Sequence, residues 1–361
     1  MIAFTVDACW LDGWRGRTTL VADDEGFRRA RGNDPEPEAH LAGTVLPGFR
    51  DAHVHLGLVD GTELLAGGIA AVDDFGWELD LARTWPTSPG FPRVTIAGQL
   101  LTAPGGYPTA SGWAPPGAAC EIAAPDDAPA AVDRQLEAGA AFIKVALNAD
   151  AGPVLDDATL ARVVEHAHAR GVTVVAHAQG KGQAARAFAA GVDVLAHAPW
   201  SERLSDELLG AMAAGAMAAG ATAGATAARP MTWVSTLDIH GWGARDADFV
   251  VASDNVRRFH AAGGRIRYGT DLGNGPLPVG INARELLALE HAGLGLDALA
   301  AAIATGAPGA PNGFGRHLSV ISAEDAPDRA PDPAADPATH PAAWLATARL
   351  IDHDRLKEHL R

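Results

Sequence analysis

The segments EAGAAFIKV (residues 137–145), ARGVTVVAH (169–177) and AAGVDVLAH (189–197) share one pattern. Each begins with residues typical of the last turn of a helix, continues through a glycine, and ends in a short apolar run typical of a buried strand. Because strands that alternate with helices build parallel sheets, this repeated unit predicts an α/β fold.

Eight strands of this kind are predicted along the chain, at residues 44–46, 69–75, 93–101, 141–147, 172–178, 192–198, 231–237 and 265–270. Helices are predicted between several of them, at 127–138, 156–170, 180–190, 205–219 and 246–262. Eight units over about 250 residues favour a closed (β/α)8 TIM barrel. A doubly wound nucleotide-binding sheet is the rival fold, but the sequence contains neither GxGxxG nor GxxxxGK[ST].

The two ends of the chain differ from its middle. Short strand-like runs at 2–6, 18–21, 318–321 and 344–350 predict that residues 1–43 and 318–361 pair into a small β-sandwich-like domain beside a barrel formed by 44–317. The Ala/Gly-rich stretch 211–228 predicts a helix extended by local duplication, with a loose glycine-rich end, and its role stays open.

Composition limits the classes of protein. Lys and Arg number 28 against 44 Asp and Glu, so the formal net charge is −16, which disfavours a nucleic-acid binder. Cys9 and Cys120 cannot form a disulfide framework. No apolar run suits a membrane span, and no signal peptide is evident. We therefore expect a cytoplasmic protein that acts on a small molecule, with its oligomeric state open between a monomer and a homo-oligomer.

The motif PGFRDAHVH, residues 47–55, follows the first predicted strand and contains two histidines. In an extended strand, residues i and i+2 point to the same face, so His53 and His55 project together, as two imidazoles that chelate one metal ion require. Two packed or surface histidines would give the same short pattern. The motif alone is therefore weak evidence for a metal site.

Three further strand ends carry side chains that can bind metal: His177 follows VVA, His197 follows VLA and Asp271 follows YGT. The carboxyl ends of barrel strands meet on one face, so we expect these side chains to share a site. Imidazole and carboxylate suit Zn²⁺ or a similar transition metal, and the lack of a thiolate excludes a closed structural zinc site. Such a metal would lower the pKa of bound water to about 7 and supply hydroxide as a nucleophile.

Lys144 lies inside the apolar run AFIKVAL, where burial of an unpaired ammonium is costly. One interpretation is that the side chain reaches the barrel end and pairs with an Asp or Glu. The other is that CO₂ carboxylates the amine, which turns it into an anion able to bridge two metal ions.

Taken in order, PGFRDAHVH, IKV, VVAHA, DVLAHA and GTD resemble the metal-ligand motifs of the amidohydrolase superfamily. The resemblance covers about residues 40–310, and the chain ends match the small β-sandwich usual in that superfamily. The lysine-containing pattern is similar to the binuclear branch, with its imidazolonepropionase-related and dipeptidase-like members.

The resemblance implies a ligand set for two divalent metal ions, expected to be Zn²⁺. His53 and His55 would bind the first ion together with Asp271, and carboxylated Lys144 would bridge the two ions. His177 and His197 would bind the second ion.

The resemblance also implies that Asp271 takes the proton from a metal-bridged hydroxide and passes it to the leaving group. Tyr107 stands where many relatives of this branch carry a histidine after the glycines, which leaves the substrate open. The Tyr107 hydroxyl either polarises a carbonyl oxygen or belongs to a turn residue packed on Trp113. His240 follows the seventh predicted strand and is a candidate for substrate contact. Asp51 is interpreted as structural.

Three classes of function remain. We expect a metal-dependent hydrolase that cleaves an amide or other C–N bond, of peptide, N-acyl amino acid or lactam type. The alternatives are a deaminase of a heterocycle, which usually uses one metal on this fold and does not need Lys144, and a non-catalytic relative. The last would normally have lost ligands, and none is missing.

Overall fold

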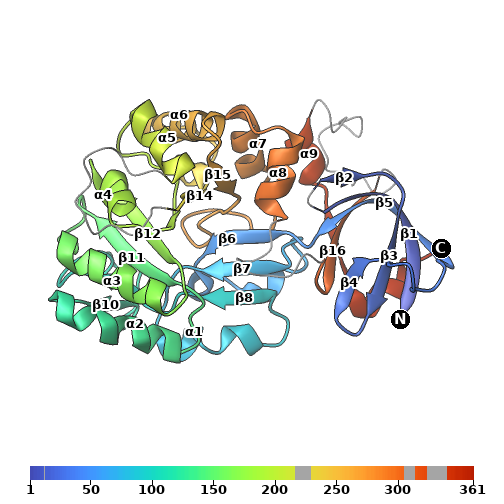
Figure 1. Cartoon of the computed structure of the whole chain (residues 1–361), viewed down its shortest axis with the longest axis horizontal. Coiled ribbons are helices and arrows are strands. Elements are labelled where there is room, and N and C mark those ends of the chain that lie inside the picture. The colour runs from blue at the N-terminus through green and yellow to red at the C-terminus, as the bar shows by residue number, and fades with distance from the viewer. Residues whose placement is uncertain (12, 216–228, 305–313, 323–339) are drawn as a thin grey trace.

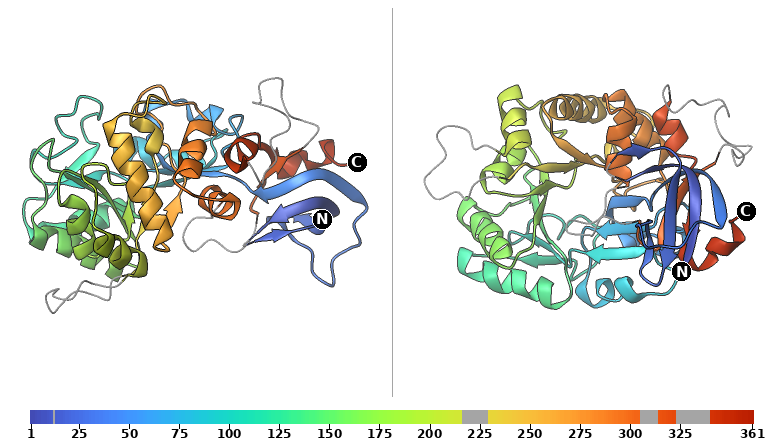
Figure 2. Two further views of the ribbon diagram at one scale, coloured as in Figure 1. Left: turned by 90° about the horizontal axis from the view of Figure 1, so that it is seen from above. Right: turned by 45° about the vertical axis from the view of Figure 1, so that its right-hand side comes forward.

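The computed structural model describes residues 1–11, 13–215, 229–304, 314–322 and 340–361 (Figure 1). Parallel strands fill the larger part of the molecule, and helices lie around them (Figures 1 and 2). A separate sheet, built from the two ends of the chain, lies beside this part (Figure 1). The arrangement is a mixed α/β fold, as the repeated helix–glycine–strand unit predicts.

Two parallel sheets hold the strands of the larger part. One has the order β10-β9-β11-β12-β13-β14-β15, and the other has the order β6-β7-β8. The first comprises β9 (Leu100–Thr102), β10 (Ala119–Glu121), β11 (Ile143–Asn148), β12 (Val174–Gln179), β13 (Val194–Leu195), β14 (Thr232–Val234) and β15 (Arg265–Arg267). The second comprises β6 (Arg50–Val54), β7 (Ala71–Asp74) and β8 (Arg93–Ile96).

Backbone hydrogen bonds join the two sheets at both edges of the smaller one. The Ala141 amide donates to the Ile96 carbonyl at 2.9 Å, next to β8. The Ala52 amide donates to the Tyr268 carbonyl at 3.0 Å, next to β6. The parallel strands therefore curl around a common interior. A buried apolar cluster takes one residue from each of seven neighbouring strands or strand ends: Ala52, Phe75, Ala97, Phe142, Val175, Ala196 and Val234.

The described residues form nine α-helices. They are α1 (Leu79–Ala82), α2 (Ala128–Glu137), α3 (Asp157–Ala169), α4 (Gln183–Ala189), α5 (Asp206–Ala214), α6 (Ala247–Ala261), α7 (Ala283–His291), α8 (Leu296–Ile303) and α9 (Pro341–Leu345). Of these, α2 to α6 lie near the positions that the sequence predicts, and the other four were not predicted. Asp156 caps α3 by accepting a hydrogen bond from the Thr159 amide. Gly171 follows this helix with φ +77°, a conformation that glycine adopts easily. None of the helices in the described parts of the chain is long and apolar enough to cross a bilayer.

Short 3-10 helices complete the connections, at Leu56–Leu58, Gly61–Glu63, Trp85–Thr87, Pro125–Asp127, Leu237–Ile239 and His353–Glu358.

The terminal sheet has the order β17-β16-β5-β1-β3-β4, with β2 paired to β1. Its strands are β1 (Ile2–Trp10), β2 (Trp14–Arg15), β3 (Thr18–Asp23), β4 (Gly26–Arg29), β5 (Ala39–Pro47), β16 (His317–Ile321) and β17 (Arg349–Asp352). Strands from the two ends of the chain thus pair with each other, as predicted. Phe4, Leu20, Val45 and Leu318 lie in its buried core.

Three predicted elements differ from the structure. Residues 44–46 belong to β5, where Val45 pairs with Val320 of the terminal sheet, and the first strand of the larger part begins only at Arg50, after the Pro47-Gly48 break. Residues 93–101 form two strands, β8 and β9, because the chain turns at Gly98 with φ +77°. Trp344 lies in α9 rather than in a strand.

The predicted helix at 205–219 is shorter in the structure. α5 ends at Ala214, and Gly215 follows in the left-handed conformation. Residues 216–228 of the Ala/Gly-rich stretch lie outside the described residues.

Candidate active site

His53, His55 and Asp271 form a three-residue cluster at the carboxyl ends of β6 and β15. One nitrogen or oxygen atom of each lies within 4.8 Å of the others. His53 Nε2 lies 3.0 Å from Asp271 Oδ1, and His55 Nε2 lies 3.4 Å from the same oxygen. Parallel strands thus bring residues 53 and 271 together although they are far apart in the sequence.

The other two predicted histidines extend this cluster. The ring centroids of His53 and His197 are 4.6 Å apart, and those of His197 and His177 are 4.8 Å apart. His55, His53, His197 and His177 therefore form a continuous row of four imidazoles, with His53 and His55 separated by 5.3 Å.

Hydrogen bonds fix the outer ring nitrogens of this row. His53 Nδ1 lies 2.8 Å from the Ala196 carbonyl and His55 Nδ1 lies 3.3 Å from the Gly76 carbonyl. A carbonyl oxygen only accepts, so Nδ1 of His53 and of His55 each carries a proton, and the Nε2 atoms, which face Asp271 Oδ1, are the atoms that would bind a metal ion. His197 Nδ1 is held in a similar way, 2.9 Å from Thr236 Oγ1.

Burial favours the neutral form of three of these imidazoles, those of His53, His177 and His197. It lowers the pKa of His53 to about 4 and that of His177 to about 3, and it holds the pKa of His197 well below its ordinary value. Neutral imidazole is the form that binds metal ions.

Asp271 stays ionised in spite of its burial. Burial alone opposes ionisation, but the His53 and His55 side chains outweigh this effect and hold the pKa of the carboxyl well below its usual range. Asn274, which the sequence analysis missed, donates from Nδ2 to Asp271 Oδ2 at 2.9 Å. The backbone of Asp271 adopts φ +59°, a left-handed conformation that is uncommon outside glycine.

Lys144 lies on β11 with 1 % of its surface exposed. Its Nζ lies 4.5 Å from the centroid of the Phe75 ring, and within the described residues no carboxylate oxygen comes within ion-pair distance of it. The interpretation as an ion-pair lysine thus finds no partner among these residues. Burial lowers the pKa of Lys144 to about 7, against the opposing pull of Asp271 and Asp74.

Two buried carboxylates hold the backbone around the cluster. Asp51 accepts hydrogen bonds from the His53 amide and the Thr270 amide, both at 3.0 Å, and so ties β6 to the segment that leads to Asp271. Asp74 accepts from the Leu56 amide at 2.8 Å and from the Gly76 amide at 3.1 Å. The structural role predicted for Asp51 agrees with these contacts, whereas Asp74 was missed.

Tyr107 lies against the histidine row. Its ring stacks on His177 with centroids 5.1 Å apart and an angle of 21°. The indole nitrogen of Trp113 donates to its hydroxyl oxygen at 3.1 Å, and Trp113 itself lies 5.0 Å from the His55 ring. Tyr107 is thus both packed on Trp113 and part of the site, and its own hydroxyl proton is still available to a ligand.

His240 contacts the histidine row through Trp200. Its ring centroid is 5.0 Å from Trp200, whose ring in turn lies 5.3 Å from His197. His240 Nε2 is buried and finds no hydrogen-bond partner among the residues that the structure describes. His240 therefore lies beside the histidine row without belonging to it. Trp242, by contrast, is 43 % exposed and donates its indole proton to the Asn274 carbonyl.

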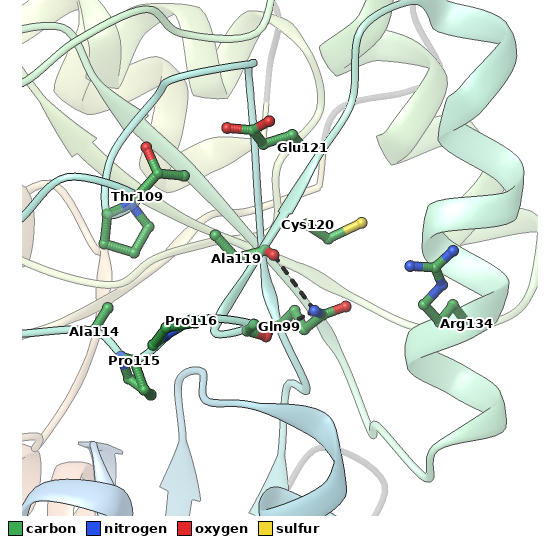
Figure 3. Close-up of a pocket in the computed structure, with 11 residues that line it drawn as sticks. Gln99, Thr109, Ala114, Pro115, Pro116, Ala119, Cys120, Glu121 and Arg134 are labelled. Carbon is green, nitrogen blue, oxygen red and sulfur yellow. Dashed lines mark hydrogen bonds between the residues drawn. The ribbon is translucent and has the colours of Figure 1, made fainter.

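A cavity of about 480 Å³ lies next to the segment that carries Tyr107 (Figure 3). Its lining includes Pro108, Thr109, Glu121 and Arg134, but none of the four histidines of the row. The cluster of His53, His55 and Asp271 therefore lies at the strand ends, outside the lining of this cavity.

No protein-family model matches the chain. An uncharacterised protein of Mycobacterium tuberculosis and one of Mycobacterium bovis are each 29% identical to it over 173 residues, which is 43% of this chain and 45% of theirs. The chain thus matches less than half of the length of these curated relatives.

Solved structures match over almost the whole chain. An Xaa-Pro dipeptidase with bound methionine has a TM-score of 0.72 and 18% identity, covering 100% of this chain and 99% of that one. The ochratoxinase of A. niger has a TM-score of 0.73 and 18% identity, covering 98% and 94%. A protein described as an amidohydrolase has a TM-score of 0.67 and 16% identity, covering 98% of both chains. The chain therefore shares the mixed α/β fold of these solved structures, as the resemblance predicts.

Proposed function

We propose that this protein is a metal-dependent enzyme of the amidohydrolase superfamily, which hydrolyses an amide or other C–N bond of a small molecule. The observation that carries the proposal is the cluster of His53, His55 and Asp271, whose ligand atoms lie within 4.8 Å of one another. The histidine row extends from this cluster to His197 and His177. The similarity in fold to a dipeptidase and to an ochratoxinase supports the same class of reaction.

The donor atoms fit two divalent ions. His53, His55 and Asp271 would hold the first, because two Nε2 lone pairs and one carboxylate oxygen already face each other. His177 and His197 would hold the second, and Lys144 carboxylated by CO₂ would bridge them. Nitrogen and oxygen ligands suit Zn²⁺. When bound, the ions would supply Lewis acidity and lower the pKa of water to about 7.

The chain's own side chains would direct the proton and the substrate. Asp271 accepts the proton of the attacking water and returns it to the leaving nitrogen, while Asn274 holds Oδ2 in place. The Tyr107 hydroxyl donates to the substrate carbonyl oxygen, because its oxygen already accepts from Trp113. His240 contacts the substrate from the side of Trp200.

We further propose that β6–β8 and β11–β15 close into one (β/α)8 barrel. The hydrogen bonds at both edges of the smaller sheet and the shared interior cluster support this. The division into a barrel, predicted at 44–317, and a small domain, predicted at 1–43 and 318–361, belongs to the same proposal, except that residues 44–47 pair with β16 and so go with the small domain. We also propose a cytoplasmic location and no binding of nucleic acid.

The metal content tests the proposal. Protein purified without chelator is expected to hold two divalent ions per chain by elemental analysis. Chelation should abolish hydrolysis of a panel of amides, lactams and dipeptides, and addition of Zn²⁺ should restore it. His53→Ala should lose metal and activity. His166→Ala should keep both, because His166 lies on α3 and pairs with Asp133 of α2. One ion per chain with full activity would favour a deaminase, and a metal-free, inactive protein would favour a non-catalytic relative.

A further inference from the structure

Six side chains surround the space in front of the metal-ligand atoms in an unbroken cycle of ring contacts. The histidine row makes up four of them, and Tyr107 and Trp113 close the cycle. Tyr107 stacks on His177 at 5.1 Å, the rings of Tyr107 and Trp113 are 6.1 Å apart, and Trp113 lies 5.0 Å from His55. The two side chains that close the cycle opposite the histidine row, Tyr107 and Trp113, are therefore both aromatic.

Two further indoles continue this aromatic surface outward. Trp77 lies 6.2 Å from Trp113. Trp200 lies 5.8 Å from His177 and 5.3 Å from His197. A ligand above the metal-ligand atoms thus meets indole and phenol rings on more than one side. Flat aromatic or apolar groups pack well against such rings.

Three arginines in the segments that follow β13, β14 and β15 already have partners. Within the described residues, Arg203 pairs with Asp254, Arg284 of α7 pairs with the buried Asp238, and Arg245 contacts His291. Arg134 lines the separate cavity next to Tyr107 (Figure 3). A carboxylate bound among the rings, away from the metal-ligand atoms, would lose its hydration without gaining one of these guanidinium groups as an unshared partner, and that burial is unfavourable.

We propose that the substrate is an uncharged amide, carbamate or related C–N compound, with a flat apolar group beside the bond that is cleaved. Dipeptides and N-acyl amino acids, which carry a free carboxylate, are poor substrates. The inference rests on the proposed hydrolase function and narrows its substrate class. In the reaction, the water oxygen bonds to the carbonyl carbon, the C–N bond breaks, and the amine nitrogen takes up a proton.

A matched set of acetamides tests the substrate class on the metal-loaded enzyme. N-acetylbenzylamine is the neutral aromatic compound, and N-acetylphenylglycine adds one carboxylate to it. N-acetylcyclohexylmethylamine replaces the flat ring, and an analogue with a 4-ammoniomethyl group adds a positive charge. We expect kcat/KM for N-acetylbenzylamine to exceed that for N-acetylphenylglycine by about tenfold or more. It should also exceed the values for the cyclohexyl and ammonium compounds.

Variants of two tryptophans test whether the aromatic surface causes the preference for the neutral aromatic substrate. Trp113→Leu and Trp200→Leu are expected to raise KM for N-acetylbenzylamine more than they lower kcat, and to reduce its advantage over the cyclohexyl compound. Trp14→Leu is the matched control, because Trp14 packs on Trp344 in the terminal part of the molecule. This variant should keep the wild-type ratio between the substrates.

The outcomes separate the two proposals. If N-acetylphenylglycine is cleaved as fast as N-acetylbenzylamine or faster, the substrate class is wrong and the hydrolase function stands. A faster reaction of the ammonium compound would instead indicate a site for cations. If neither these four compounds nor the panel of amides, lactams and dipeptides is cleaved, the hydrolase function fails, and calorimetric titration with the four compounds measures the binding preference directly. Equal or tighter binding of the carboxylate would then overturn the inference.

Discussion

Asn274 Nδ2 donates a hydrogen bond to Asp271 Oδ2 at 2.9 Å and leaves Oδ1 of that carboxylate facing His53 and His55. The two oxygens of Asp271 thus have different surroundings, one held by an amide and one beside the ligand nitrogens. A carboxylate that binds a metal ion and moves a proton needs this kind of fixed orientation.

Asp271→Asn should reduce turnover strongly. The amide keeps the shape and one oxygen ligand but cannot accept a proton at neutral pH. General base catalysis typically contributes about 10²–10⁴-fold, so kcat should fall by a factor in that range or above it, with little change in KM. Steady-state kinetics with metal analysis checks this. A kcat within a few-fold of wild type would move the proton transfer to another group, with His240 as the next candidate.

Asn274→Ala should have a smaller effect of the same kind. Because Asn274 positions Asp271 without facing the ligand nitrogens, we expect kcat to fall by about 10–100-fold while metal content stays at the wild-type level. Asn274→Asp tests the direction of the hydrogen bond, since a second carboxylate cannot donate to Oδ2. Recovery of turnover in Asn274→Asp would contradict the positioning role.

Lys144→Ala should remove activity, and short carboxylic acids added to the assay should restore part of it. The acid would take the place of the carboxylate that CO₂ forms on the lysine, whereas water alone would do so poorly. Lys357→Ala, at an exposed position of the terminal segment, is the control and should behave like wild type. If Lys144→Ala keeps near-normal activity and metal content, the assignment of Lys144 as a bridging ligand is wrong.

Asp73→Asn should destabilise the fold without touching the site. Asp73 is buried between Arg50 and Arg267 and pairs with both guanidinium groups. Loss of its charge leaves two buried cations without a partner, which typically costs about 3–5 kcal/mol. Urea denaturation measures the change. Asp354→Asn, which removes an exposed partner of Arg316, should change the stability little.

Because Glu285 is buried, its contribution to the free energy of unfolding should decrease as the pH rises from about 4.5 to about 7. Burial raises the pKa of Glu285 from 4.5 to about 7, against the opposing effect of the hydrogen bonds that its carboxyl accepts. In this pH range the folded state holds the proton that the unfolded state releases, so the free energy of unfolding falls as the pH rises.

Glu285→Gln removes this titration. The difference in the free energy of unfolding between variant and wild type should therefore shift in favour of the variant by an amount on the order of 2 kcal/mol between pH 4.5 and pH 8. Urea denaturation at several pH values measures it. A constant difference across the range would show that Glu285 titrates normally in the folded protein.

The parts of the site that depend on local rules were predictable from the sequence. His53 and His55 share a face because residues two apart in a strand always do. His177, His197 and Asp271 were expected near them because each ends an apolar strand, and the structure brings all five side chains together.

Contacts that depend on distant partners were not predictable. The local pattern of residues 44–46 shows a strand but not which sheet it joins, and the structure pairs it with β16. The contact of Asn274 with Asp271, only three residues away, was also missed, because the sequence does not show that Asp271 has a left-handed backbone. The break at Gly98 was visible only as one glycine in an apolar run, which an unbroken strand also tolerates.

The connection between β5 and β6 has a consequence for how the protein is made. The Phe49 amide, four residues before His53, donates to Ser319 Oγ at 3.0 Å across 270 positions of the sequence. Gly48 is likewise bonded to the His317 carbonyl. During synthesis from the N-terminus, the strand that leads to His53 and His55 must wait for a segment that is translated about 270 residues later. Until then, chaperones and proteases meet a chain in which the backbone before these two histidines lacks its partners in β16.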